Sequence, residues 1–250
     1  MCGIAGIVEN NGIEDCTDST VEHMVSLLGH RGPDGHGVYR DGDAGLGHAR
    51  LSIIDIEGGS QPIHNEDKSV WVVFNGEIFN YIELRAELEQ NGHRFYTHSD
   101  TEVIVHLYEE QGESFPSFLN GQFAIALWDQ NKKRLILVRD RPGILPLYYA
   151  LRGSRLIFAS EAKSVVCGLG EPSMLDPLAL DQLFTFWSPV APRTLFEGVM
   201  QLPPGHLAVF ENRRLVVNCY WNWLFPEDNE YLGASDESIA EQLHDLLVDA

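Results

Sequence analysis

The sequence has few cysteines, and it shows neither a disulfide framework nor a metal-binding motif. Its four cysteines stand at positions 2, 16, 167 and 219 and form neither a CxxC pair nor any close pair. In a chain of 250 residues this pattern excludes a disulfide-rich secreted scaffold and favours reduced thiols in a cytoplasmic protein. The ten histidines include no HExxH pair, so the sequence predicts no metal site.

Basic residues and long apolar runs are also scarce. Lys and Arg total 17 against 37 Asp and Glu, which gives a formal charge of −20. Such a charge argues against nucleic acid or an anionic membrane surface as a partner. The start of the chain lacks the basic and apolar regions of a signal peptide. No apolar run approaches the ~18 residues of a membrane-spanning helix. The apolar content of 44% suits a globular chain with a sizeable core.

Hydrophobic periodicity predicts an α+β fold. The ranges expected as strands are about 3–8, 45–55, 70–74, 123–128, 135–139, 147–151, 156–160, 206–210 and 215–220, and those expected as helices are about 18–29, 80–91, 99–112, 161–166 and 176–186. This order contains several antiparallel hairpins and no regular alternation of strand and helix. It therefore predicts a four-layer αββα sandwich, in which two mainly antiparallel sheets are flanked by helices.

Two local signals set expected boundaries. The strand at 70–74 runs into Asn75-Gly76-Glu77, a turn signal at which the strand is expected to stop. Ser99-Asp100-Thr101-Glu102 has the form of a capping box, with Ser99 as N-cap and Glu102 as the third helical residue.

The end of the chain predicts a second domain. Residues 226–234 have the composition of a linker, and Ser235 then begins a helix with one apolar face. Nothing follows on which that face could pack. We therefore expect a domain at 2–225, a linker at 226–234, and at 235–250 the first helix of a domain that this sequence cuts short.

Eight short stretches form a recognisable pattern. They are Met1-Cys2-Gly3-Ile4, His30-Arg31-Gly32-Pro33-Asp34, Arg50-Leu51-Ser52-Ile53-Ile54-Asp55, Phe74-Asn75-Gly76-Glu77-Ile78-Phe79-Asn80, Ser99-Asp100-Thr101-Glu102, Arg139-Asp140-Arg141 with Pro146-Leu147-Tyr148-Tyr149, Ser160-Glu161-Ala162-Lys163 and Leu202-Pro203-Pro204-Gly205-His206. In this order they resemble the class II glutamine amidotransferases, which are N-terminal nucleophile hydrolases. Within that group they resemble the glutaminase domain of the asparagine synthetase family, over roughly residues 2–225.

Cys2 is the candidate nucleophile. Removal of Met1 would leave a thiol and a free α-amine on one residue, which is a nucleophile beside its own base. A thiol pKa of ~8.5 and an α-amine pKa of ~7.7–8 let the two groups exchange a proton cheaply. The alternative is an incidental cysteine at a frayed terminus.

The remaining site residues match the parts of a glutamine pocket. Asn75 and Gly76 would donate hydrogen bonds to an oxyanion, although Asn-Gly is also a common plain turn. Arg50 would bind the α-carboxylate and Asp100 the α-ammonium; the alternatives are a surface arginine and an acid that favours a helix N-terminus. The resemblance implies that Glu77 and the backbone of Leu51, Ser52, Ile53 and Ile54 complete the pocket. Residues 30–37 are expected to form a lid, with a rigid turn as the alternative.

The resemblance implies an ammonia-producing enzyme. Such a domain hydrolyses L-glutamine to glutamate without a cofactor. It feeds ammonia to its own C-terminal synthetase domain, which uses ATP and Mg²⁺ to make asparagine from aspartate. A homodimer is expected on the same ground. Two alternatives stay open: an amidotransferase for another carboxylate in cell-wall, polysaccharide or antibiotic synthesis, and a regulatory domain without catalysis.

Overall fold

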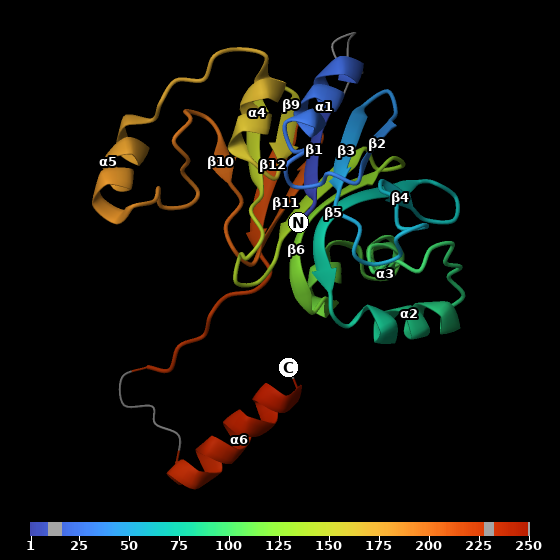
Figure 1. The fold of residues 1–250 in the computed structure, drawn as a ribbon, viewed down its shortest axis with the longest axis vertical. Helices are drawn as coiled ribbons and strands as arrows, with labels where there is room; N and C mark the ends of the chain where they lie inside the picture. The colour runs from blue at the N-terminus through green and yellow to red at the C-terminus, as the bar shows by residue number, and fades with distance from the viewer. Residues whose placement is uncertain (10–16, 228–232, 250) are drawn as a thin grey trace.

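Two six-stranded antiparallel sheets form the centre of the molecule (Figure 1). The computed structural model describes residues 1–9, 17–227 and 233–249. The first sheet has the strand order β10-β8-β9-β1-β3-β2 and the second β12-β11-β7-β6-β5-β4. The strands are β1 (Gly3–Glu9), β2 (Gly35–Arg40), β3 (Ala44–Arg50), β4 (Ile63–His64), β5 (Val70–Ile78), β6 (Gly121–Asp129), β7 (Arg134–Arg139), β8 (Tyr148–Arg152), β9 (Arg155–Ala159), β10 (Met200–Gln201), β11 (His206–Glu211) and β12 (Arg214–Cys219).

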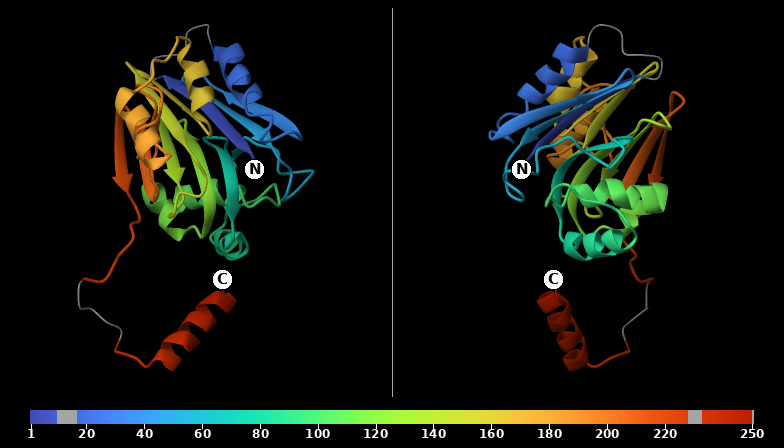
Figure 2. Two further views of the ribbon diagram at one scale, coloured as in Figure 1. Left: turned by 60° about the vertical axis from the view of Figure 1, so that its left-hand side comes forward. Right: turned by 90° about the vertical axis from the view of Figure 1, so that its right-hand side faces the viewer.

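Helices cover the outer faces of both sheets (Figure 2). The helices are α1 (Thr17–Ser26), α2 (Tyr81–Gln90), α3 (Glu102–Gln111), the 3₁₀ helix η1 (Gly112–Phe118), α4 (Ala162–Leu169), α5 (Pro177–Phe186) and α6 (Asp236–Asp249). α1 and α4 pack on the first sheet, and α3 packs on the second. None of the helices in the described ranges is both long and apolar enough to cross a bilayer.

Side-chain alternation along the strands builds three separate cores. On β1, Ile4 and Val8 face the second sheet, whereas Ala5 and Ile7 face α1. The core between the sheets is filled by large side chains such as Trp128, and the third core lies between β5, β6 and α3. Three cores require four layers, so the predicted αββα sandwich is confirmed.

The expected end of the strand at residue 74 is wrong. β5 continues to Ile78, and its Asn75, Gly76 and Glu77 pair with β6. A Cβ atom on Gly76 would lie 2.1 Å from the carbonyl oxygen of Gln122 on β6. The glycine therefore permits a close approach of two paired backbones and does not mark a turn.

The predicted capping box is also wrong. α3 begins at Glu102, and Thr101 holds the N-cap position without a side-chain cap bond. The Glu102 carboxylate accepts hydrogen bonds from the backbone N–H groups of Tyr96 at 2.8 Å and Thr97 at 2.7 Å. It thereby fixes the segment before the helix, and Asp100 lies outside the first helical turn.

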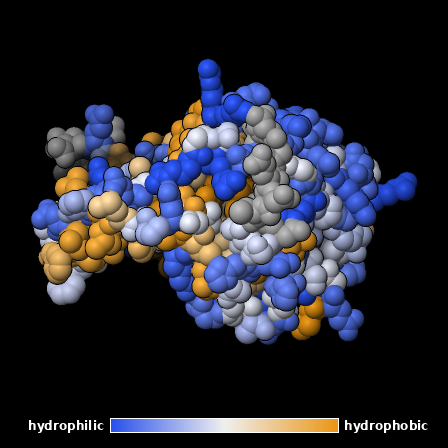
Figure 3. Space-filling view, turned by 90° about the horizontal axis from the view of Figure 1, so that it is seen from above, coloured by the Kyte–Doolittle hydropathy of each residue, from blue (hydrophilic) through white to orange (hydrophobic). Residues whose placement is uncertain are grey.

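Large apolar side chains are exposed at one side of the molecule and near its C-terminus. Phe184, Phe186 and Trp187, on and just after α5, are mostly exposed. Figure 3 shows apolar surface on the protruding side that carries α5. On α6, Leu243 and Leu247 are exposed as well. The proposed linker at 226–234 lies partly outside the described residues, which omit 228–232.

Candidate active site

Cys2 lies directly before β1, with its side chain in the gap between the sheets. Residues 2 and 4 share one face of an extended chain, and Ile4 belongs to the core between the sheets. The Cys2 sulfur accepts a hydrogen bond from the Leu51 N–H at 3.2 Å and lies 3.5 Å from the Leu51 carbonyl oxygen. The thiol therefore faces the loop that follows β3.

A second set of contacts fixes the backbone of Cys2. Arg31 donates from Nε to the Cys2 carbonyl oxygen at 2.9 Å and from Nη1 to Glu161 at 3.1 Å. A Cβ atom on Gly32 would lie 2.3 Å from the backbone of Ala49, so the turn is seated on β3. These contacts favour the rigid turn over the lid for the first part of residues 30–37.

Opposing influences act on the Cys2 thiol. Burial raises its pKa above the ordinary value, whereas the Leu51 N–H, the terminal ammonium and Arg50 act in the opposite direction. The Asp100 carboxylate raises the pKa further.

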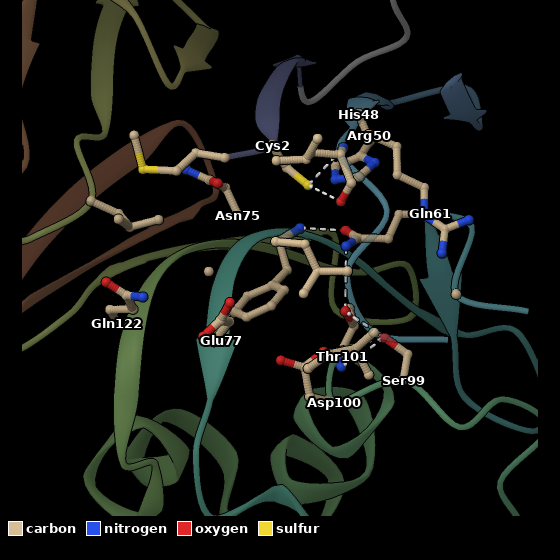
Figure 4. Close-up of a pocket in the computed structure, with 18 residues that line it drawn as sticks. Cys2, His48, Arg50, Gln61, Asn75, Glu77, Ser99, Asp100, Thr101 and Gln122 are labelled. Atoms are coloured by element: carbon tan, nitrogen blue, oxygen red, sulfur yellow. Dashed lines mark hydrogen bonds between the residues drawn. The ribbon is translucent and has the colours of Figure 1, made fainter. Parts of the chain in front are cut away.

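One cavity brings the predicted site residues together (Figure 4). It is bordered by every predicted residue except Ser52, whose N–H donates to Asp34 at 2.8 Å. The sequence reasoning did not identify several other lining residues: Met1, His48, Gly59, Gln61, Phe74, Ser99, Thr101, Gln122 and Leu145.

The edge of β5 presents one backbone donor to this cavity. The Phe74 N–H donates to Oε1 of Gln61 at 2.6 Å, and the Ile78 N–H donates to Oδ2 of Asp100 at 3.0 Å. In an antiparallel strand, N–H groups two residues apart point to the same side. The Gly76 N–H therefore points to the same edge, between two neighbours that already have acceptors.

The Asn75 side chain supplies a second donor. Asn75 is buried, and its Nδ2 has no hydrogen-bond partner among the described residues. Phe123, which lies opposite Gly76, makes its backbone hydrogen bonds with Asp140 instead. Its N–H donates to Oδ2 of Asp140 at 3.2 Å, and its carbonyl oxygen accepts from the Asp140 N–H at 2.9 Å. Buried donors without a partner are costly, so the Asn75 amide and the adjacent N–H are two donors that a ligand oxygen would satisfy.

Acidic groups stand at the other end of the cavity. Figure 4 shows Glu77 and Asp100 across the opening from Cys2. Asp100 is buried, and it also accepts a hydrogen bond from Ser99 Oγ at 3.3 Å. Burial raises the pKa of the Asp100 carboxyl, and Glu77 adds to the rise. A cationic ligand group would relieve this unfavourable accumulation of negative charge.

Arg50 organises the loop on one side of the cavity. Its Nη2 donates to the Asp55 carbonyl at 2.6 Å, and its Nη1 donates to the Ile56 carbonyl at 3.0 Å and to Ser60 Oγ at 3.2 Å. These bonds leave Nε–H and one Nη2–H, the two parallel donors that bind a carboxylate side-on.

Two of the additional lining residues have clear physical roles. Gln61 bonds Phe74 with its oxygen and Thr101 Oγ1 with its nitrogen at 3.3 Å, so it joins the β5 edge to the Asp100 segment. Its loop position gives no sequence signal. Burial lowers the pKa of His48 to about 3, so this side chain stays neutral. Its position two residues before Arg50, on β3, is the signal that could have identified it.

The fold and this arrangement define a class of protein: a four-layer αββα domain with a polar pocket at its first cysteine. The model of the glutamine amidotransferase domain family matches residues 1–221, and the chain belongs to that family.

Named relatives agree with this membership. The chain is 41% identical over 207 residues to asparagine synthetase (glutamine-hydrolyzing) 1 of Bacillus subtilis (strain 168), an alignment that covers 82% of this chain and 33% of that protein. It is 35% identical over 262 residues to amidase chyE of Penicillium rubens, which covers 100% of this chain and 38% of that protein. The chain thus spans about a third of the length of these curated relatives.

A solved structure shares the fold. Glutamine phosphoribosylpyrophosphate amidotransferase from B. subtilis superposes with a TM-score of 0.62 at 20% identity, over 88% of this chain and 49% of that one. At this identity the likeness establishes the architecture alone.

Proposed function

We propose that the chain hydrolyses L-glutamine to glutamate and ammonia through a thioester on Cys2. The observation that carries this proposal is the shared cavity of the Cys2 sulfur, the unpartnered Asn75 amide and the Gly76 N–H. Membership of the glutamine amidotransferase domain family supports it.

The reaction begins with removal of Met1, which borders the same cavity. The α-amine of Cys2 then takes the thiol proton, and the thiolate attacks the carboxamide carbon. Asn75 Nδ2 and the Gly76 N–H hold the oxyanion of the tetrahedral intermediate. The protonated amine returns its proton to the departing ammonia, and water hydrolyses the thioester to glutamate.

Substrate selection follows from the two charged ends of glutamine. The parallel donors of Arg50 bind the α-carboxylate, and Asp100 with Glu77 binds the α-ammonium. Leu51, Ile53 and Ile54 line the same side of the cavity as the Arg50 loop. A ligand that lacks either charge leaves one of these buried groups unpaired.

The ammonia has a consumer outside this chain. We infer that a C-terminal synthetase domain uses ATP and Mg²⁺ to convert aspartate to asparagine with this ammonia. The names of the B. subtilis relatives, which are asparagine synthetases (glutamine-hydrolyzing), support this inference. The boundaries 2–225, 226–234 and 235–250 and a homodimer belong to the same proposal. The exposed apolar side chains of α5 and α6 support a covering partner.

A second acceptor is favoured by one observation. The chain is as similar to the fungal protein named amidase chyE as to asparagine synthetase (glutamine-hydrolyzing) 3, at 35% identity in both cases. The acceptor in this alternative is a carboxylate other than aspartate. ATP–pyrophosphate exchange by the full-length protein, with aspartate and a panel of other carboxylic acids, distinguishes the two.

The glutaminase proposal is tested by mass and activity together. Intact mass of the active protein should show Met1 removed, and Cys2→Ala should abolish glutamate release, whereas Cys167→Ala should retain it. Active protein that keeps Met1 contradicts the α-amine mechanism. Full glutamate release by Cys2→Ala contradicts the thioester, and no release by any form favours a regulatory domain.

A further inference from the structure

Two histidines and two glutamates converge outside the glutamine cavity. Glu66 lies between β4 and β5, His93 lies between α2 and α3, and His106 and Glu109 lie on α3. Each contributes one ligand atom, and these four atoms lie within 4.8 Å of one another. None of the four residues borders the glutamine cavity.

Four nitrogen–oxygen distances within this cluster are close to the separation of two ligand atoms around one ion, with Glu66 facing His106 through Oε2 and His93 through Oε1. His106 Nδ1 lies 3.2 Å from Glu109 Oε2 and 3.4 Å from Glu66 Oε2. His93 Nδ1 lies 3.5 Å from Glu66 Oε1 and 3.7 Å from Glu109 Oε2. Ligands that bind a tetrahedral Zn²⁺ at ~2.0–2.1 Å stand roughly 3.4 Å apart.

The outer nitrogens of both imidazoles face carboxylates. His106 Nε2 lies 3.5 Å from Glu102, and His93 Nε2 lies 3.3 Å from Glu110. A ring that carries its hydrogen on Nε2 faces this carboxylate with an N–H group and presents the lone pair of its Nδ1 to an ion. Histidines that bind metals are held in this way by an outer carboxylate.

The carboxylate ligands are positioned as well. Glu109 accepts a hydrogen bond at 2.8 Å from the amide of buried Asn65, and Glu66 accepts one at 2.8 Å from the Arg94 N–H. His106 is fully buried, and its ring packs against Phe95 at 4.5 Å between centroids. The two glutamates are partly exposed, which leaves a way in for an ion.

We propose that Glu66, His93, His106 and Glu109 bind one Zn²⁺ ion. Two imidazoles and two carboxylates favour zinc over Mg²⁺ or Ca²⁺, which prefer oxygen ligands alone. The ion would join the β4–β5 loop and the α2–α3 connection to α3. Because Glu102 holds both His106 and the backbone of Tyr96 and Thr97, the ion would also stiffen the segment that leads to Asp100.

The test is zinc binding by the purified full chain in a Cys2→Ala background, so that the nucleophilic thiol contributes no ligand. After chelator treatment, Zn²⁺ is titrated against a chromophoric chelator, and Co²⁺ is used to report tetrahedral geometry by visible absorption. We expect one ion per chain. His93→Gln and Glu109→Gln should lower affinity at least 100-fold, and Glu110→Gln roughly 10–100-fold.

The matched control is His244→Gln, because His244 is an exposed histidine on α6. It should bind zinc as the parent does. Zinc should raise the melting temperature of the parent and leave that of His93→Gln unchanged, which separates metal loss from misfolding. Less than one ion per chain, equal affinity in His93→Gln and His244→Gln, or no tetrahedral Co²⁺ spectrum overturns the proposal in favour of a metal-free ion-pair cluster.

Discussion

At the residue scale, the Cys2 thiol lies between two charges of opposite sign. Arg50 lowers its pKa and Asp100 raises it, on top of the rise caused by burial. The thiolate is the reactive form, so alkylation accelerates as pH rises through this pKa. We predict that Arg50→Gln moves the pH profile of Cys2 alkylation to higher pH and that Asp100→Asn moves it to lower pH.

Iodoacetamide labelling of the Cys2 peptide, followed by mass spectrometry across a pH series, measures these profiles. Arg152→Gln is the control, because Arg152 lies outside the cavity lining and should leave the profile in place. Shifts of both test variants in the same direction would contradict the charge balance.

Asn75 yields a kinetic prediction. If its Nδ2 binds the oxyanion only in the transition state, Asn75→Ala should lower kcat for glutamine hydrolysis about 10²–10³-fold, with little change in KM. The check is steady-state glutamate release, with exposed Asn131→Ala as the control. A rise in KM without a loss of kcat would assign Asn75 to ground-state binding instead.

The sequence identified residues with chemistry of their own more readily than residues that act through the backbone. Cys2, Arg50, Asn75 and Asp100 stand in short motifs, and the structure brings all four to one cavity. Gln61 acts by accepting from an N–H group 13 residues away, and such a contact leaves no trace in composition or spacing. Ser52 shares a motif with Arg50, yet its N–H serves Asp34.

At the scale of elements, the close approach of the paired strands β5 and β6 at Gly76 limits which side chains β5 tolerates there. An added Cβ would lie 2.1 Å from the Gln122 carbonyl. We predict that Gly76→Ala lowers the free energy of unfolding by about 1–3 kcal/mol. Gly42→Ala, where an added Cβ meets nothing within 4 Å, should change it by less than about 0.5 kcal/mol. Urea unfolding compares the two, and equal midpoints would contradict the close approach.

Hairpins were predictable, whereas element ends beside the site were not. The pairs β6–β7, β8–β9 and β11–β12 follow the expected alternation and turns. The end of β5 was missed because Asn-Gly is a strong turn signal in isolation and only the partner strand overrides it. The start of α3 was missed because the Glu102 carboxylate is drawn to Tyr96 and Thr97 and not to Ser99.

At the scale of the whole molecule, the exposed apolar side chains on and just after α5 allow a test of the interface with a synthetase domain that does not disturb the folding of this chain. Phe184 and Trp187 are 81% and 91% exposed, so Phe184→Ser with Trp187→Ser should change the melting temperature of this chain little. If a synthetase domain covers them, the same pair in the full-length protein should raise the ratio of glutamate formed to amide product. Ile82→Ser, also exposed but on α2, should leave the ratio unchanged. An unchanged ratio in both variants would remove α5 from the proposed interface.

The layers of the fold were predictable from the sequence, whereas the order of the strands within each sheet was not. The pattern of apolar residues dictates two sheets and three cores. The placement of β1 between β3 and β9 joins segments about 150 residues apart, and antiparallel partners at that distance leave no local signal. The cluster of Glu66, His93, His106 and Glu109 escaped notice for the same reason, since the fold and not a motif assembles it.

The hydrogen bond from Arg31 to the Cys2 carbonyl has a practical and a biological consequence. It anchors the backbone of Cys2, so the residue before Cys2 is held at the border of the cavity, as Met1 is. Under the proposed α-amine mechanism, a polypeptide that keeps Met1 is latent, and a methionine aminopeptidase decides when it becomes active. Under the same mechanism, an affinity tag or fusion partner placed before Cys2 would preserve that latency.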